Sequence, residues 1–344
     1  MNASQTLRRS CTIAAVGYAL SFILYLLLRL IVGDGWWWLA LLNSFMLWTF
    51  LPLLLLLPLA LVMKTPRVFL LLSAILAVAV VAYAPRFLPK PIALASGTTL
   101  RVVTFNIWGS NQALEAVETW LRATNADVVL LQEIPPAYAV ETVPHLADIY
   151  EHQFFQTTNE RYWGNGILSR YPLIERENVL MGDEGLQQRV VIEVEGQQMV
   201  IYNVHFYMPQ TDTPHFVLPV DYPYLNIALL YDDPLRNRQI QGLLDAVRTE
   251  QTPTVVGGDF NMSDSSVFYN TVAAEMHDSF REAGVGFGLS WPNARQESAL
   301  PQWLPAVMRI DYIWYRGDLQ ATVAQVGPPL GSDHLPVLTT LLLP

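Results

Sequence analysis

Acids, amides and imidazoles stand at the ends of short apolar runs in the second part of the chain. The run that ends in "GGDFN" places Asp259 and Asn261 two residues apart, a spacing that puts both side chains on one face of a strand. Other apolar runs end in Asn106, Gln132, Glu133, Asn203, His205, Asp311, Asp333 and His334. A carboxylate base, imidazoles, amide donors and hard oxygen ligands are the groups that metal-assisted hydrolysis of a phosphate ester needs.

Each of these residues also has an ordinary structural explanation when taken alone. Asn106 or Gln132 fits a turn or cap, and "GGDFN" fits a tight turn because Gly, Asp and Asn favour turns. Glu133 fits a solvated residue at a helix start, and His205 fits a hydrogen-bonded core histidine. Because six separate segments end in the same way, we interpret the set as functional.

The elements that would position these residues are short. Runs rich in β-branched and aromatic residues predict strands at 100–108, 127–134, 188–196, 198–206, 253–261, 309–317 and 336–343. Apolar residues at helical spacing from Leu114 to Leu121, behind an Asn111 cap, predict a helix, and 236–250 and 263–275 predict two more. Strands joined by helices in some places and by hairpins in others predict a mixed α/β sandwich.

The first part of the chain has a different composition. Residues 1–99 carry seven Lys/Arg and one acid, and the runs 10–28, 35–63 and 68–85 are uncharged. Each run is long enough to cross about 30 Å of hydrocarbon as a helix. A cleaved secretory signal is the alternative for the first run, but its apolar core would be only about 7 to 15 residues. We therefore predict a membrane domain at 1–85 with three transmembrane helices, a linker at 86–99 and a catalytic domain at 100–344.

Positive charges near the ends of the runs predict the orientation of this multi-pass protein. Arg8 and Arg9 precede the first run, and Lys64 and Arg67 lie in the second short loop. The positive-inside rule then places the N-terminus in the cytoplasm and the catalytic domain on the extracytoplasmic side. Arg86 and Lys90, beyond the third run, oppose this assignment.

The charge of the second part disfavours a long polyanion as partner. Residues 100–344 contain 13 Lys/Arg, no lysine and 29 Asp/Glu, a net charge near −16. Nucleic-acid binding draws most of its affinity from cationic contacts with phosphate, so nucleic acid is the less favoured substrate. The single cysteine, Cys11, lies in the first apolar run, so this part has no disulfide and depends on its core.

The polar residues occur in motifs whose order matches a known family. "TFNIW", "LLQEI", "GNGILSRYPL", "NVHF", "GGDFN", "RIDYIW" and "GSDHLP" follow one another between residues 100 and 343. In this order they resemble the endonuclease/exonuclease/phosphatase superfamily, which contains DNase I-like nucleases, neutral sphingomyelinases and inositol-polyphosphate 5-phosphatases. The resemblance implies a DNase I-like four-layer α/β sandwich of two mixed β-sheets flanked by helices. It implies nothing about the three apolar runs.

The resemblance also implies a role for each matching residue. Asn106 and Glu133 match the ligands of the catalytic Mg²⁺, with Asp333 close by and Mn²⁺ as the alternative metal. Asp259 matches the residue that orients or deprotonates water, and Asn261 matches the neighbour that steadies the phosphate.

The histidines complete the implied set. His334 matches the histidine that faces the phosphate, Asp311 the carboxylate that fixes its ring, and His205 a second histidine found in several branches. Arg189 and Asn165 match supporting positions, and Tyr162 lies near the place of a catalytic tyrosine in some branches.

These observations predict a membrane-anchored, Mg²⁺-dependent phosphoric ester hydrolase that acts on a diester or monoester of a lipid or lipid-linked substrate. The long, aromatic-rich connection at 207–235 is expected to be a lid on the substrate side, or else to pack on the flank of the domain. An extracytoplasmic DNase I-like nuclease is the alternative enzyme. A catalytically idle scaffold is disfavoured because none of the expected catalytic positions is substituted.

Overall fold

The computed structural model describes residues 3–90, 97–135, 138, 143–156, 164–182, 185–216, 228–293 and 301–343. The chain divides into two compact units, one formed by residues 1–88 with 265–268 and the other by residues 89–264 with 269–344. Within the described residues, the first unit is helical and the second contains the strands.

The helical unit contains two helices that are long and apolar enough to span a membrane, Gln5–Val32 and Pro66–Phe87. Between them, α2 and the segment Met46–Val62 meet at a bend of 75°, and they make a third span only if the bent pair counts as one. The elements are α1 (Ala3–Val32), α2 (Trp37–Ser44), η1 (Met46–Phe50), α3 (Pro52–Val62), α4 (Pro66–Tyr83) and η2 (Ala84–Phe87). The break lies at Phe45, between α2 and η1, so the second apolar run is interrupted although its composition is uniform.

The second unit is built on two six-stranded sheets. The first has the order β11-β12-β1-β2-β4-β3 and the second the order β5-β6-β7-β8-β10-β9. The first sheet consists of β1 (Thr98–Asn106), β2 (Val128–Ile134), β3 (His152–Gln156), β4 (Gly164–Ser169), β11 (Gln320–Val326) and β12 (Val337–Leu343). The second consists of β5 (Leu173–Leu180), β6 (Leu186–Val194), β7 (Gln197–His205), β8 (Thr254–Asp259), β9 (His277–Asp278) and β10 (Asp311–Arg316). Both sheets are mixed, because β1 is parallel to β2 and β7 is parallel to β8 while the other pairs are antiparallel.

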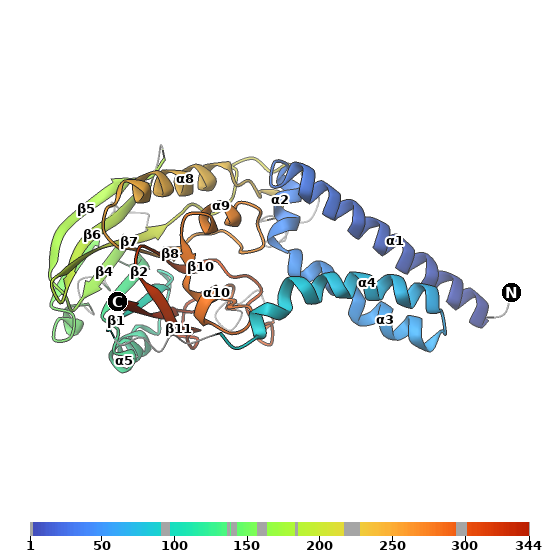
Figure 1. Ribbon diagram of the computed structural model, residues 1–344, viewed down its shortest axis with the longest axis horizontal. Helices are drawn as coiled ribbons and strands as arrows, with labels where there is room; N and C mark the ends of the chain where they lie inside the picture. Colours follow the sequence, from blue (N-terminus) through green and yellow to red (C-terminus); the bar gives the residue numbers. More distant parts are fainter. Residues whose placement is uncertain are drawn as a thin grey trace. The chain divides into compact units, whose positions relative to one another are not determined.

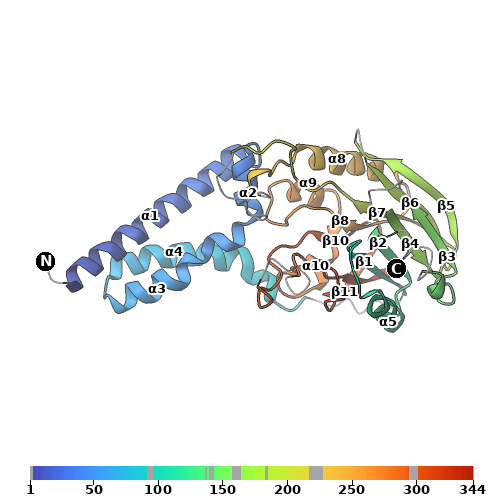
Figure 2. The same ribbon diagram turned by 180° about the vertical axis from the view of Figure 1, so that it is seen from behind.

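The two sheets lie face to face between helices (Figures 1 and 2). Alternate residues of β1 face opposite sides: Val102 joins the core between the sheets, and Val103 packs with Val117 and Leu121 of α5 (Leu114–Thr124). The second sheet is covered by α8 (Pro234–Thr249), whose buried stripe includes Ile240, Leu243, Leu244 and Val247. The unit is therefore a four-layer DNase I-like sandwich, as the sequence predicted.

Several predicted elements differ in extent. The helix expected at 263–275 is only α9 (Tyr269–Ala273), and α10 (Ser279–Ala283), η3 (Val143–Leu146) and the strands β3, β4, β5, β9 and β11 were not predicted. Asn111 is not the cap of α5. Its side chain instead accepts a hydrogen bond from Ala113 N (2.8 Å) and donates one to the Leu330 carbonyl (3.0 Å).

Candidate functional site

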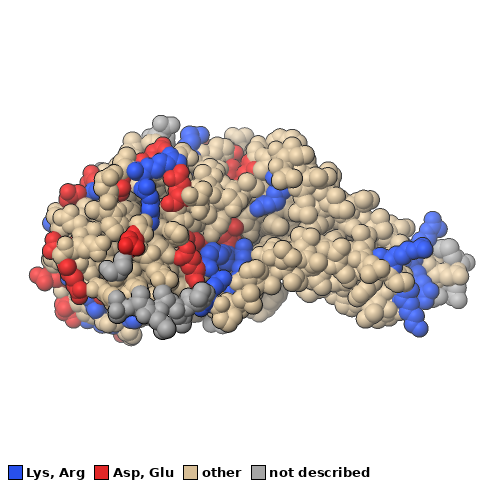
Figure 3. Space-filling view, in the orientation of Figure 1, with Lys and Arg blue, Asp and Glu red and all other residues tan. Residues whose placement is uncertain are grey.

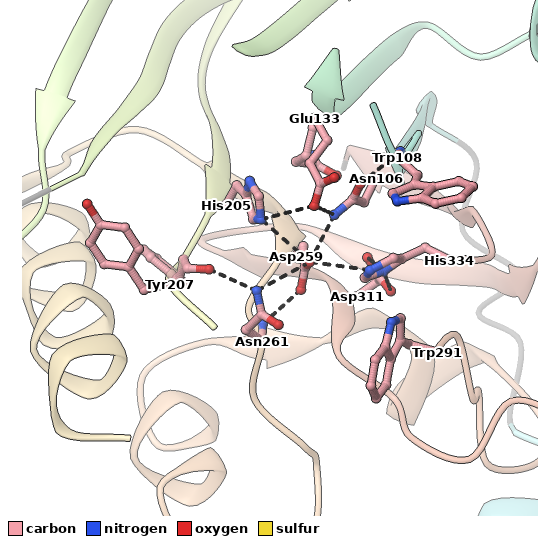
Figure 4. Close-up of polar contacts among 12 residues, drawn as sticks. Asn106, Trp108, Glu133, His205, Tyr207, Asp259, Asn261, Trp291, Asp311 and His334 are labelled. Carbon is pink, nitrogen blue, oxygen red and sulfur yellow. Dashed lines mark hydrogen bonds and ion pairs between the residues drawn. The ribbon is translucent and has the colours of Figure 1, made fainter. Parts of the chain in front are cut away.

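Strand register brings the polar strand ends to one edge of the sandwich. In the second sheet His205 of β7 lies beside Asp259 of β8, and Asp259 lies opposite Asp311 of β10. In the first sheet Asn106 ends β1 beside the end of β2, which carries Glu133. Both sheets thus deliver their polar residues to the same place, where Figure 4 shows the side chains converging.

The two glycines of "GGDFN" allow β8 to fit at this edge. Gly258 has φ +155°, and a Cβ atom there would overlap the carbonyl oxygen of Val204 on β7. A Cβ at Gly257 would come within 2.5 Å of Leu130 in the facing sheet. At Gly257 the Leu130 side chain could move aside, but at Gly258 the clash is with the backbone of β7, so a side chain there would push β8 away and displace Asp259.

Asp259 is the centre of the site. Its carboxylate is almost fully buried and accepts a hydrogen bond from Asn106 Nδ2 (3.1 Å). The Nε2 atoms of His205 and His334 lie 3.8 Å and 3.7 Å from Asp259 Oδ2. Two imidazoles therefore flank one buried carboxylate (Figure 4).

His334 is fixed by a carboxylate on its far side. Its Nδ1 lies 3.0 Å from Oδ2 of Asp311, which is fully buried. The His334 backbone N–H also donates to Ser332 Oγ, whose hydroxyl donates to the Asn106 carbonyl. With Nδ1 on Asp311, the ring presents Nε2 toward Asp259 and the reacting groups.

Asn261 is held in a left-handed backbone conformation with φ +48°. Its N–H donates to Asp259 Oδ1 (2.8 Å), and its Nδ2 donates to the Phe206 carbonyl (2.9 Å). The carboxamide is thus tied to the loop that follows His205.

Burial and neighbouring charges raise the pKa values of two groups in the site, Asp259 and His334. Burial raises the pKa of Asp259 from 3.8 to about 6; the Asp311 charge adds to the rise, and the histidine charges oppose it. Burial alone would lower the pKa of His334, but the Asp311 and Asp259 carboxylates outweigh it and raise that pKa well above 6.5. Perturbed groups gathered in this way are typical of functional sites.

The donor set at Glu133 fits a hard divalent cation. Glu133 is the most exposed acid of the group, with about a quarter of its side chain accessible, and it accepts a hydrogen bond from Asn106 Nδ2 (2.9 Å). Among the described residues, no Lys or Arg forms an ion pair with Glu133, Asp259 or Asp311. Carboxylate oxygens are the ligands that Mg²⁺ prefers, so Glu133 fits this cation. Asn106 turns Nδ2 toward Glu133 and accepts a hydrogen bond from the Trp108 N–H on Oδ1 (3.1 Å), so its amide oxygen would bind a metal only with the carboxamide turned over.

A second group of ligand atoms also lies close together. One atom each from Asp259, Asp311 and His334 falls within 4.8 Å of the others, and all three residues are buried. The Nδ1 of His334 already pairs with Asp311, so we interpret this group as a hydrogen-bonded acid–imidazole arrangement.

The other predicted residues lie as follows. Asp333, beside His334, accepts a hydrogen bond from Trp291 Nε1 (3.2 Å), and its charge helps to raise the pKa of His334. Arg189 does not contact the site: it pairs with Glu250 (2.7 Å), Glu175 and Glu177. Asn165 is buried on β4, and Tyr162 lies outside the described residues.

Two residues of α8 support the site and were not predicted. Arg236 is 1% exposed, pairs with Asp233 (2.9 Å) and donates from Nη1 to the Asn261 carbonyl (2.7 Å). Gln239, one turn further on, accepts a hydrogen bond from the Tyr207 N–H (2.9 Å). Their signal in the sequence was two polar residues within the apolar stripe of a helix.

The fold and the site define a class of protein. It is a DNase I-like sandwich whose strand ends carry a buried carboxylate, two imidazoles and a carboxylate that could bind a divalent metal. Residues 103–334 match the profile of the Endonuclease/Exonuclease/phosphatase family, and the chain belongs to this family. Members of the family are hydrolases that act on phosphoester bonds, generally with a divalent metal.

Solved structures show the same fold. TDP2 from C. elegans is 18% identical with a TM-score of 0.57 and aligns over 73% of this chain and 77% of its own. An endonuclease/exonuclease/phosphatase from Bacteroides vulgatus is 17% identical with a TM-score of 0.56, over 72% of this chain and 100% of its own. A family protein from Leptotrichia buccalis is 15% identical with a TM-score of 0.54, over 70% and 99%. Among curated proteins, no sequence matches the chain significantly.

Proposed function

We propose that the protein is a membrane-anchored, Mg²⁺-dependent phosphoesterase that hydrolyses a phosphodiester or phosphomonoester of a lipid or lipid-linked substrate. The observation that carries the proposal is the buried Asp259 carboxylate with the Nε2 atoms of His205 and His334 within 3.8 Å of it. This arrangement offers a base and two imidazole groups at one point.

The residues divide the work of hydrolysis. Asp259 accepts the proton of the attacking water, because its carboxylate lies within 3.8 Å of both Nε2 atoms, whereas Asp311 is paired with Nδ1 of His334. The Nε2 groups of His205 and His334 would donate to the phosphoryl oxygens, and Asp311 holds the His334 ring in place. The Asn261 amide lies beside them, with its Nδ2 3.5 Å from Asp259 Oδ2.

Asn106 and Glu133, with Asp333 nearby, are the residues that would hold Mg²⁺, or Mn²⁺ as the alternative. Bound there, the metal would supply Lewis-acid stabilisation of the negative charge that develops on the phosphoryl group.

Apolar helices and surface charge support a lipid substrate at a membrane. Long apolar side chains of α1 and α4 are exposed, among them Leu30, Ile31, Leu70 and Val81. Figure 3 shows Lys and Arg gathered at one end of the helical unit, where α1 begins and α3 turns into α4; the basic residues there are Arg8, Arg9, Lys64 and Arg67. By the positive-inside rule this end faces the cytoplasm, which supports an extracytoplasmic catalytic unit.

The segment after His205 is the proposed substrate-side lid. Tyr207, Met208 and Phe216 are 39%, 49% and 61% exposed. The segment runs beside residues 228–231, with Thr211 N–H donating to the Leu230 carbonyl (2.8 Å). Residues 217–227 lie outside the described part of the chain. Full activity on every lipid after deletion of 212–232 would remove this assignment.

The first experiment separates an enzyme from a scaffold. The full chain in detergent is assayed on bis-p-nitrophenyl phosphate with Mg²⁺ and with EDTA, beside Asp259→Asn. Activity that needs both Mg²⁺ and Asp259 supports the proposal. Equal turnover by the variant overturns it, and so does the absence of turnover by the wild type on both this diester and the monoester p-nitrophenyl phosphate.

The second experiment assigns the substrate. A panel of phospholipids in mixed micelles is compared with plasmid DNA under the same conditions. Faster hydrolysis of a lipid supports the proposal, and cleavage of DNA alone assigns the chain as a nuclease. The matched control is Arg238→Met, an exposed change on α8 that should leave every rate unaltered.

A further inference from the structure

Glu133 stands at an irregular point of the first sheet. The pairing of β2 with β4 is interrupted between Leu131 and Ile134, and Glu133 has φ +54°, a left-handed conformation that glutamate rarely adopts. Such a conformation costs on the order of 1–3 kcal/mol and persists only where surrounding contacts hold it. The residue that presents the metal-ligand carboxylate must therefore be held by something other than its own strand.

Asn203 of the second sheet reaches the first sheet at this interruption. It is fully buried, and its Nδ2 donates to the Leu131 and Gly166 carbonyls, both at 3.0 Å. Its Oδ1 accepts a hydrogen bond from Gln132 Nε2 (2.7 Å). The Asn203 side chain therefore binds β2 directly before Glu133, and it also binds β4 where the pairing of β2 with β4 is interrupted.

Further hydrogen bonds fix the orientation of the Asn203 side chain. Its Nδ2 also lies 2.9 Å from Gln188 Oε1, so its two hydrogens are shared among three acceptors, and Gln188 in turn donates to the Phe154 carbonyl of β3. Gln132 and Gln188 are both 0% exposed. Buried amides are costly unless their hydrogen bonds are made, so a network that uses every group of Asn203 permits few other arrangements.

His205 lies two residues beyond Asn203 on the same strand and therefore on the same face. A rigid strand links the two, so the anchoring of Asn203 at Gln132 also sets how far His205 stands from Glu133. The observed distance from His205 Nε2 to Glu133 Oε1 is 3.7 Å.

We propose that Asn203 is a positioning residue, which joins the two sheets through Gln132 and thereby places Glu133 for metal binding beside His205. This inference rests on the proposed function for its metal. Gln132 and Asn203 thus belong with the other polar residues at strand ends, although neither touches the reacting groups.

The test measures metal affinity apart from turnover. The full chain in detergent is titrated with Mg²⁺ by calorimetry as wild type, Asn203→Leu, Gln188→Met and the control Gln198→Met, an exposed glutamine at the other end of β7. Loss of a supporting partner typically weakens metal binding about 10–100-fold, which we expect for Asn203→Leu. We expect a smaller loss for Gln188→Met and no change for Gln198→Met. Wild-type affinity in Asn203→Leu would overturn the proposal.

A double variant distinguishes positioning from simple stabilisation. Asn203→Leu removes the shortest hydrogen bond of Gln132 Nε2 (2.7 Å) and leaves it only Thr104 Oγ1 (3.1 Å) and the Leu130 carbonyl (3.2 Å). Gln132→Met in the same chain removes this weakened buried amide, so the double variant should recover part of the lost Tm. Mg²⁺ affinity should stay low, since the link between the sheets is still missing. If affinity recovers in parallel with Tm, the network is only structural and the proposal fails.

Hydrogen exchange provides a readout that needs no metal. In Asn203→Leu, the amides of residues 131–134 and 203–206 should exchange faster than in wild type, while those of β10 and β12 stay protected. A uniform rise across both sheets would contradict a positioning role. If wild-type protein binds no Mg²⁺, the proposed function fails, and the exchange pattern still decides the role of Asn203.

Discussion

At the scale of single residues, the site depends on a buried carboxylate whose pKa is raised. Burial and the charge of Asp311 raise the pKa of Asp259 to about 6, so at lower pH the base is increasingly protonated. We expect kcat/KM on bis-p-nitrophenyl phosphate to rise with pH on an acid limb near 6, and a bound divalent cation would move this limb lower. A rate that does not vary between pH 4 and 8 would argue against Asp259 as the base.

The Asp311 carboxylate gives a second prediction for activity. It raises the pKa of His334, so Asp311→Asn should move the alkaline limb of the pH profile to lower pH. The rate itself should fall about 10²–10⁴-fold, the usual contribution of a positioned acid or base. An unshifted alkaline limb at reduced rate would mean that Asp311 is needed only for folding.

The same pair predicts a pH dependence of stability with a definite sign. Because the folded-state pKa of His334 is raised above 6.5, the resulting stabilisation is fully present below pH 6.5 and is lost as pH rises through the folded pKa. The difference in Tm between wild type and Asp311→Asn should therefore be largest below pH 6.5 and shrink in alkali. Differential scanning calorimetry across pH checks this, and a difference that grows in alkali would reverse the assignment.

At the scale of elements, the sequence predicted the strands whose interiors are apolar and the polar residues at their ends. It did not predict β5, "LIERENVL", because an exposed edge strand lacks the apolar run on which the prediction relied. The expected helix at 263–275 shortened to α9, since Asp264, Ser265 and Ser266 lie in a non-helical turn and are largely buried.

The residues of the site were easier to predict from the sequence than the residues that hold them in place. Residues that do chemistry are rare types at strand ends, so they stand out in the sequence. Arg236, Gln187 and Gln188 are ordinary residue types whose roles depend on contacts with distant segments. Gln187, for example, exchanges hydrogen bonds with both backbone groups of His205, at 2.7 Å and 3.1 Å.

Helix α8 carries a prediction of its own. Arg236→Met should remove the anchor of the Asn261 carbonyl and leave Asp233 buried without its arginine. Breaking a buried ion pair typically costs about 3–5 kcal/mol, and we expect a loss of unfolding free energy of that order by urea titration. Arg238→Met, on the exposed face of the same helix, is the control. Wild-type stability in Arg236→Met would show that the pair contributes nothing.

At the scale of the whole molecule, the chain divides into two compact units near residue 88, with residues 265–268 in the first unit, and the domains expected at 1–85 and 100–344 stay a prediction. Composition alone was enough to locate the apolar runs. A long segment with few charges is stable only in a membrane or in a large protein core, so its low charge identifies it. Composition did not reveal the 75° bend in the second run. The bend depends on where the helical hydrogen bonds of the backbone are broken. Apolar content does not determine the position of such a break.

Orientation across the membrane is the last prediction. The chain has one cysteine, so Cys11→Ala gives a background into which single cysteines are placed as Gln5→Cys near the start of α1 and Gln198→Cys on β7. If Arg8, Arg9, Lys64 and Arg67 keep their end in the cytoplasm, a membrane-impermeant maleimide added to intact cells should label Gln198→Cys and not Gln5→Cys. Permeabilised cells should show both labels, which controls for accessibility. The reverse pattern in intact cells would place the catalytic unit in the cytoplasm. Its substrate would then be confined to the inner leaflet, because a tethered site reaches only the leaflet that it faces.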